Sequence, residues 1–314
     1  MGTDTAAKKL AQIKATDFSG WPVTFWLVKK KIARKKAHYD VLRVDTDTRL
    51  QQRFQGFLKQ QLQDRDFHLS SYDFNNADGD DVLFTIAADA TEFVNIQAAV
   101  EAGFDNPLAK NYDELLNSWA YIALFENGGK RLYACRKISA ETQPRKVKSK
   151  SATFFQHHKL VDIDEKEIFL IDPRYDFFVF EDTIFIAHKR QFESAMNFRE
   201  GMIANGAEVL SDFEKLKLVD DVKIIREYVG TNLHHLRKLS SIRKSGYYKQ
   251  PGYMKKLIAV SQSEKWDLKI YQDKIVVEPD TVELLLKLLN NDRLRSPIND
   301  ELFDSAAKEP VPGR

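Results

Sequence analysis

The chain has 314 residues, of which 43% are hydrophobic and 30% are charged, a composition typical of a protein that folds around packed cores and is neither disordered nor fibrous. Its length favours two domains over one. The formal net charge of +2 excludes no partner, but no apolar run approaches the ~18 residues of a membrane-spanning helix, and the first residues lack the pattern of a signal peptide. We therefore expect a cytoplasmic protein.

The N-terminal part of the sequence predicts a mixed α and β domain. Apolar residues at helical spacing indicate a helix over 48–63. The clearest hairpin surrounds Asn127-Gly128, because asparagine and glycine accept the positive φ angles of a tight turn. Runs typical of strands lie at 21–28, 39–44, 82–87, 118–125 and 131–136.

A basic stretch then separates the two halves. Apolar residues become rare between 137 and 150, while four cations accumulate beside Pro144. This composition is typical of a linker. We therefore predict a first domain at 1–140, a basic linker at 141–150 and a second domain at 151–314.

The second domain is predicted around a hairpin and the helix that follows it. The apolar runs 177–180 and 183–186 are separated only by Glu181-Asp182, which is the length of a two-residue turn. Further helices are indicated over 192–203, 222–242 and 281–289, and a second short hairpin over 267–277. The fold class that follows is α+β, with two mixed domains in which short antiparallel hairpins pack against helices.

The second half of the chain resembles a known family. The residues that carry the resemblance are Ile184-Phe-Ile-Ala-His-Lys189 with Phe192-Glu193, Ser240-Ser-Ile-Arg-Lys-Ser-Gly-Tyr-Tyr248 and Leu288-Leu-Asn-Asn-Asp-Arg-Leu-Arg-Ser296. They are similar to the KwaB-type proteins of the Kiwa anti-phage system, a family catalogued as a domain of unknown function. The resemblance covers the C-terminal half well and the N-terminal half loosely, and it contains no catalytic signature.

This resemblance implies partners that the residues themselves do not reveal. It implies that the target is the DNA of an invading phage. It also implies a small multi-pass membrane partner, KwaA-like, which would hold this cytoplasmic chain at the inner membrane. The 21 phenylalanines are many for two modest cores, and a dimer would gain avidity for DNA, so we also expect a homodimer.

Three basic clusters are candidates for DNA binding. Phosphates need several cations on one surface, and tyrosines can stack on exposed bases. The candidate residues are Lys29, Lys30, Lys31, Arg34, Lys35 and Lys36, then Arg145, Lys146, Lys148 and Lys150, and finally Arg237, Lys238, Arg243, Lys244, Tyr247, Tyr248 and Lys249. For any single cluster, an ordinary solvated surface is the competing interpretation.

Catalytic, metal and cofactor motifs are not found. There is no dinucleotide fingerprint, P-loop, nucleophile elbow or His-Glu-x-x-His sequence. The aspartates between 64 and 81 lack EF-hand spacing, the pairs His157-His158 and His234-His235 are poorly placed to share one ion, and the single Cys135 is expected to be buried. We therefore predict no catalytic residue, metal or cofactor.

Two alternatives to a DNA-binding effector stay open. A metal-dependent nuclease would use acids such as Asp162, Asp164, Glu165 and Glu167, although Glu165-Lys166-Glu167 is not the order that such enzymes require. A non-catalytic scaffold would assemble only with itself and its membrane partner, and the acidic stretch 64–81 would be its docking surface.

Overall fold

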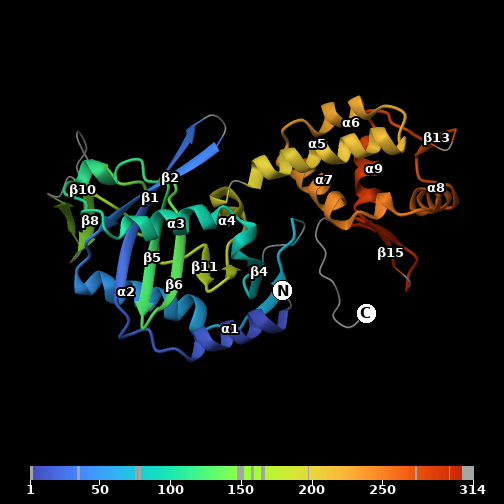
Figure 1. The fold of residues 1–314 in the computed structure, drawn as a ribbon. Coiled ribbons are helices and arrows are strands. Elements are labelled where there is room, and N and C mark those ends of the chain that lie inside the picture. The colour runs from blue at the N-terminus through green and yellow to red at the C-terminus, as the bar shows by residue number, and fades with distance from the viewer. Residues whose placement is uncertain are drawn as a thin grey trace. The chain divides into compact units, whose positions relative to one another are not determined.

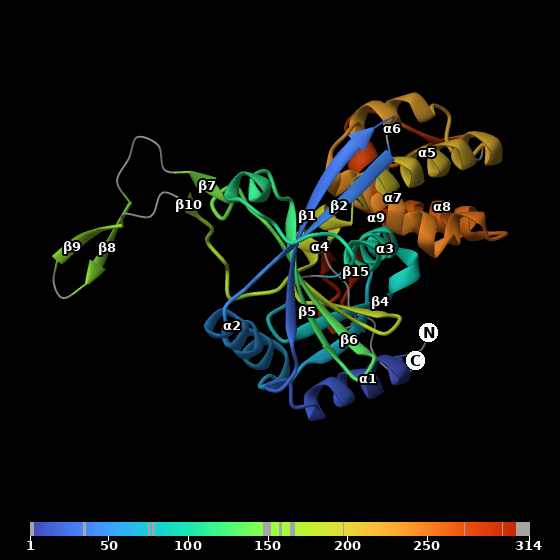
Figure 2. The ribbon, with the colours of Figure 1, turned by 60° about the vertical axis from the view of Figure 1, so that its left-hand side comes forward.

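The computed structural model describes residues 3–33, 36–74, 76, 79–146, 152–156, 159–163, 167–196, 198–272, 274–296 and 298–305. The chain divides into two compact units. Unit 1 comprises Met1–Ser71 and Asp78–Met196, and unit 2 comprises Tyr72–Ala77 and Asn197–Arg314. Their elements are drawn in Figures 1 and 2.

Unit 1 is built on an eight-stranded sheet with the order β2-β1-β5-β6-β11-β12-β4-β3. The strands are β1 (Val23–Ala33), β2 (Lys36–Val44), β3 (His68–Ser71), β4 (Val82–Ala87), β5 (Ala120–Asn127), β6 (Lys130–Lys137), β11 (Phe177–Phe180) and β12 (Thr183–Ile186). Neighbouring strands are antiparallel except β3 and β4, which are parallel. Two short pairs accompany the sheet, β7 (Arg145–Lys146) with β10 (Glu167–Ile168) and β8 (Ala152–Gln156) with β9 (Lys159–Ile163).

Helices cover both faces of this sheet, which explains why its central strands are apolar without alternation. Helices α1 (Thr3–Ala15) and α2 (Thr48–Leu58) share one core with inward residues such as Phe25 and Phe178. Helices α3 (Phe93–Gly103) and α4 (Lys189–Ala195) lie on the other face, where Phe93 and Phe192 both contact the ring of Phe177. The buried Cys135 lies on this sheet, and burial raises the pKa of its thiol.

The β11–β12 hairpin lies inside the large sheet, between β6 and β4. Its two-residue turn is the predicted one, and Glu181 adopts a φ of 54°. The backbone groups at both edges of the hairpin are paired, with β6 from Leu132 to Cys135 and with β4 from Phe84 to Ala87. The chain passes from unit 1 to unit 2 after Met196. The predicted linker at 141–150 falls within the residue range of unit 1.

Unit 2 is mainly helical, with two small hairpins. Its helices are α5 (Phe198–Leu216), α6 (Val222–Val229), α7 (Leu233–Ser245), α8 (Tyr253–Ser263) and α9 (Val282–Leu289). Its strands are β13 (Lys269–Tyr271), β14 (Lys274–Val276), β15 (Arg293–Arg295) and β16 (Leu302–Asp304). The apolar stripe predicted over 222–242 is the pair α6 and α7, interrupted at Gly230, where φ is 47°. The α+β fold class is confirmed.

Short helical turns complete the described part of the chain. They are η1 (Lys59–Gln63), which is a π-helix, and the 3₁₀ turns η2 (Ala88–Ala90), η3 (Tyr112–Leu115) and η4 (Tyr247–Lys249). No helix among the described residues is both long enough and apolar enough to span a bilayer.

Candidate nucleic-acid interface

Strands β1 and β2 extend beyond the rest of the sheet of unit 1. β1 pairs with β5 only from Val23 to Val28, but it pairs with β2 as far as Ala33. The described residues among 29–40 therefore form a two-stranded antiparallel ribbon, which we call the β1–β2 arm (Figures 1 and 2). Of the first predicted cluster, Lys29, Lys30 and Lys31 lie on this arm.

The remaining cations of this cluster belong to the same segment. Lys36 begins β2, opposite Ala33, while Arg34 and Lys35 lie outside the described residues. The sequence from 29 to 40 contains six lysines and arginines and a single acid, Asp40, so its formal charge is +5. A two-stranded ribbon with this charge is suited to contact a polyanion.

The lysines of the arm have different neighbours. The ammonium of Lys31 lies 2.5 Å from the carboxylate of Asp40, but both side chains are more than half exposed. Such a pair contributes only about 0–1 kcal/mol, so a phosphate can replace the carboxylate at little cost. The ammonium of Lys30 lies over the rings of Trp119 and Tyr39, at 5.1 Å and 5.9 Å from their centroids. Lys29 makes no ion pair with any described residue.

The second predicted cluster is only partly described. Arg145 is exposed on β7, whereas Lys146 pairs with Asp113 at 2.8 Å and with Glu167 at 3.2 Å. These carboxylates raise the pKa of Lys146 through hydrogen bonds. Lys148 and Lys150 lie outside the described residues.

The third cluster, on α7 and η4 of unit 2, is largely neutralised by acids of the same unit. Lys238 is buried and paired with Asp292. At the exposed end, Arg243 pairs with Glu208, Lys244 with Asp73 at 2.7 Å, and Lys249 with Asp212 at 2.7 Å. Arg237 is half-buried. The cluster therefore presents much less net charge than its sequence indicates.

The two tyrosines of this cluster have different surroundings. Tyr248 is buried against Phe213, with ring centroids 5.2 Å apart, and its hydroxyl donates to Asp212 at 2.7 Å. Burial and this carboxylate raise the pKa of Tyr248. Tyr247 is 41% exposed and stacks on Tyr253 with ring centroids 5.9 Å apart. Of the two tyrosines, only Tyr247 presents its ring to solvent. Tyr248, like Lys238, belongs to the interior of unit 2.

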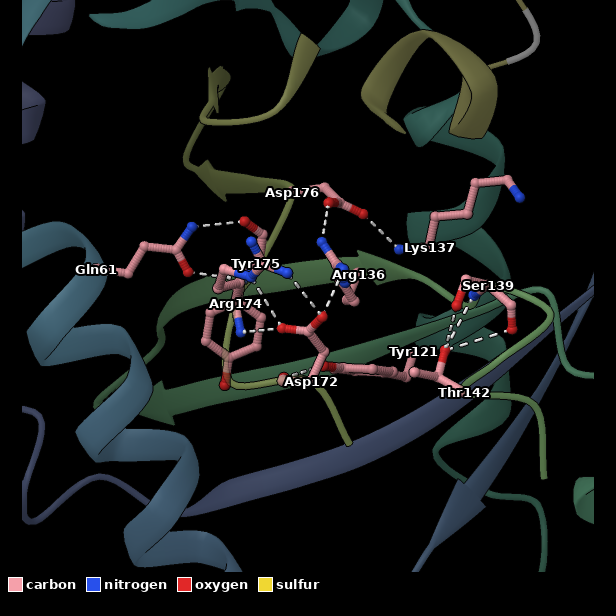
Figure 3. Close-up of polar contacts among 10 residues, drawn as sticks. All are labelled: Gln61, Tyr121, Arg136, Lys137, Ser139, Thr142, Asp172, Arg174, Tyr175 and Asp176. Carbon is pink, nitrogen blue, oxygen red and sulfur yellow. Dashed lines mark hydrogen bonds and ion pairs between the residues drawn. The ribbon is translucent and has the colours of Figure 1, made fainter. Parts of the chain in front are cut away.

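A second group of polar residues lies at one end of the sheet of unit 1 (Figure 3). Arg136, at the end of β6, donates to Asp176 at 2.5 Å and to Asp172 at 2.8 Å. Arg174 donates to Asp172 from Nε at 3.2 Å and from a terminal nitrogen at 3.3 Å. The backbone N–H of Lys137 donates to Asp176 at 2.7 Å. The two carboxylates therefore orient both arginines, of which Arg136 is 13% exposed and Arg174 is 62% exposed.

These two carboxylates have opposite pKa shifts. Burial raises the pKa of Asp176 to about 6, although Arg136 and the backbone N–H of Lys137 act in the opposite direction. Burial also acts on Asp172, but the hydrogen bonds and positive charges of Arg174 and Arg136 outweigh it and hold its pKa below the usual range.

Sequence reasoning did not identify this group or the aromatic neighbours of Lys30. Arg136 and Asp176 are 40 positions apart, and the pairing of β6 with β11 brings them together. The sequence does contain one indication of this group, since Arg136 ends one apolar run and Asp176 immediately precedes another. Two such termini meet only if the strands are neighbours, and the predicted domain boundary placed them in different domains.

The acids named for the nuclease alternative do not form a metal site among the described residues. Glu167 pairs with Lys146, Asp162 belongs to β9, and Asp164 and Glu165 lie outside the described residues, as do His157 and His158. Within the described residues, no group of three or more His, Cys, Asp or Glu side chains is arranged to hold a metal ion.

The fold and its surfaces define the class as a two-unit α+β protein with a cationic ribbon on its large sheet. A family model described as "Kiwa protein KwaB-like" matches residues 115–299, which is more than half of the chain. The chain belongs to this KwaB-like family, and its role is in Kiwa anti-phage defence. Comparisons with curated proteins and with solved structures find no match.

Proposed function

We propose that this chain is a DNA-binding effector of Kiwa defence, that it binds invading DNA mainly through backbone phosphates, and that the β1–β2 arm makes the principal contact. The observation that carries the proposal is the projection of the arm beyond β5 with a formal charge of +5 over residues 29–40. Membership of an anti-phage defence family supports phage DNA as the proposed target.

The shape of the arm suits duplex DNA. The major groove is about 12 Å wide and admits a two-stranded β-ribbon, and lysines on such a ribbon reach the phosphates on both sides of the groove. Side chains of successive residues in a strand point to opposite faces, so Lys30 lies on one face and Lys29 and Lys31 on the other. Binding of this kind reads the phosphate backbone and needs no specific base contact.

The other predicted surfaces take secondary roles in this proposal. The exposed cations of the second and third clusters add to the attraction for DNA, and Tyr247 offers a ring to an unpaired base. We further propose that the effector acts without catalysis, works as a homodimer, and is held at the inner membrane by a KwaA-like partner.

Neutralisation of the arm tests the proposal. The variant Lys29→Gln/Lys30→Gln/Lys31→Gln removes three cations that release counterions when they bind phosphate. At ~0.9 per phosphate, the slope of log affinity against log salt concentration should become shallower by about 2–3. Fluorescence anisotropy of a labelled duplex at four or five salt concentrations measures this slope.

The matched control is Arg243→Gln/Lys244→Gln, in which both cations already pair with acids of unit 2. This variant should change the slope by less than about 1 unit. Besides its acid, each cation has a second partner, Asn205 for Arg243 and the backbone carbonyl of Tyr72 for Lys244, so it is less available to phosphate than Lys29 or Lys31. If the control variant changes the slope and the arm variant does not, the principal contact lies on α7 and the assignment to the arm is wrong.

A further inference from the structure

Unit 1 contains a cavity of about 540 Å³ that is independent of the arm. It lies at the end of the sheet where β6 ends, β11 and β4 begin, and β12 leads into α4. Four arginines contribute to its lining: Arg65, which follows η1, Arg136 of β6, Arg174, which precedes β11, and Arg190 of α4. His188 also lines it, and Asp80 is the acid among its lining residues.

Two arginines of the cavity, Arg136 and Arg174, are oriented by acids before any ligand arrives. Arg136 is only 13% exposed and is held by Asp172 and Asp176, whereas Arg174 is 62% exposed and is oriented by two hydrogen bonds to Asp172 (Figure 3). Each guanidinium has five N–H donors, and the acids leave some of them unused. Preorganised donors lose little conformational entropy when a ligand binds.

The other two arginines complete the cationic lining. Arg65 donates to the backbone carbonyl of Asp80 and lies 3.3 Å from the carboxylate of Asp81. Its guanidinium also lies 5.1 Å from the centroid of the Phe67 ring. Arg190 is exposed at the start of α4 and forms no ion pair with the described residues. Its charge is therefore available to a ligand.

These residue types favour a phosphate. Arginine binds phosphate oxygens through two parallel hydrogen bonds, and it is the side chain best suited to this planar recognition. Phe67 and the Arg65 guanidinium add flat surfaces of the kind on which a base stacks. The volume lies within the range of small-ligand sites, about 300–1,000 Å³, and is larger than one phosphate group needs.

We propose that this cavity binds a nucleoside phosphate, with Arg136, Arg174 and Arg190 on the phosphate groups and Phe67 beside the base. The site is separate from the proposed DNA contact on the arm. A free mononucleotide and the terminal phosphate of a DNA strand share this chemistry, and we assign the site to the free nucleotide.

Isothermal titration calorimetry with ATP and with AMP tests the assignment. We expect saturable binding to the parent protein, and a loss of affinity of about tenfold in Arg190→Gln, since a charge-assisted hydrogen bond is lost. Arg190 is exposed and pairs with no described acid, so this variant should fold. Arg174→Gln is a second variant with the same expected loss, and Arg49→Gln, an exposed cation of α2, is the control that should leave affinity unchanged.

The arm variant separates this proposal from the proposed function, because it should lose affinity for DNA and keep its affinity for ATP. Absence of heat with both nucleotides at millimolar concentration would overturn the assignment. Equal affinity for ATP in the parent, Arg190→Gln and Arg174→Gln proteins would also overturn it. The protein could instead bind a 5′-phosphorylated oligonucleotide but neither nucleotide nor the 5′-hydroxyl oligonucleotide. That result would show that the cavity binds the end of a DNA strand and would overturn the assignment to a free nucleotide.

Discussion

Replacement of Lys238 by methionine distinguishes a structural role of this side chain from a role in DNA binding. The side chains of Lys238 and Asp292 are 7% and 4% exposed and form an ion pair. The amide of Asn290 also donates to Asp292 at 2.9 Å. Removal of the lysine leaves a buried carboxylate without its countercharge, which costs about 3–5 kcal/mol in a buried pair. We expect Lys238→Met to lower the free energy of unfolding of unit 2 by that amount.

Urea denaturation followed by circular dichroism measures this loss. The control is Lys256→Met, an exposed position of α8, which should change stability by less than about 0.5 kcal/mol. The double variant Lys238→Met/Asp292→Leu should recover most of the loss, because a buried pair can be replaced by apolar residues of similar volume. At a temperature where the single variant is folded, its affinity for DNA should equal that of the parent protein.

Two results would refute this reasoning. A loss of less than about 1 kcal/mol in Lys238→Met would show that Asp292 does not depend on the lysine for its stability in the interior. A loss of DNA affinity with little change in stability would show that Lys238 contacts DNA, as the sequence pattern predicted.

Two further predictions concern pH and assembly. Burial raises the pKa of Asp176 from 3.8 to about 6. The protonated carboxyl therefore stabilises the fold below pH 3.8, and this stabilisation is lost as the pH rises through 6. The variant Asp176→Asn cannot ionise, so its free energy of unfolding relative to the parent should rise by up to ~3 kcal/mol between about pH 4 and 7 in urea denaturation. A difference between variant and parent that does not change with pH would contradict this. For assembly, light scattering at micromolar concentration should give twice the mass of the chain, whereas the mass of one chain would exclude the homodimer.

Local patterns predicted several elements of the fold. The turn Glu181-Asp182 is the two-residue connection of β11 and β12. The hairpin of β5 and β6 also forms as predicted, but its turn is Gly128-Gly129, both with positive φ, because Asn127 still pairs with Lys130. These elements were predictable because their contacts are close in sequence and their turns have known chemistry. The position of β11–β12 in the sheet was not predictable in this way, since β4 and β6 are its neighbours only in space.

The candidate site was predictable only as a set of charges. The cations of the arm stand close together in the sequence, and their exposure follows from the absence of apolar residues among them. The neutralisation of α7 depends on Asp73 and Asp292, which lie 171 and 54 positions from their partners. No period in the sequence of α7 indicates such partners, so Lys238 looked like the other cations of that helix.

The most direct test of the central claim is the binding of the parent protein to labelled duplex DNA, measured by gel shift with and without Mg²⁺. We expect a shifted complex that weakens steeply as salt rises, with intact DNA under both conditions. Cleavage that requires Mg²⁺ would support the nuclease alternative and contradict a non-catalytic effector. If no complex forms even at low salt, the chain does not bind duplex DNA and the scaffold alternative holds.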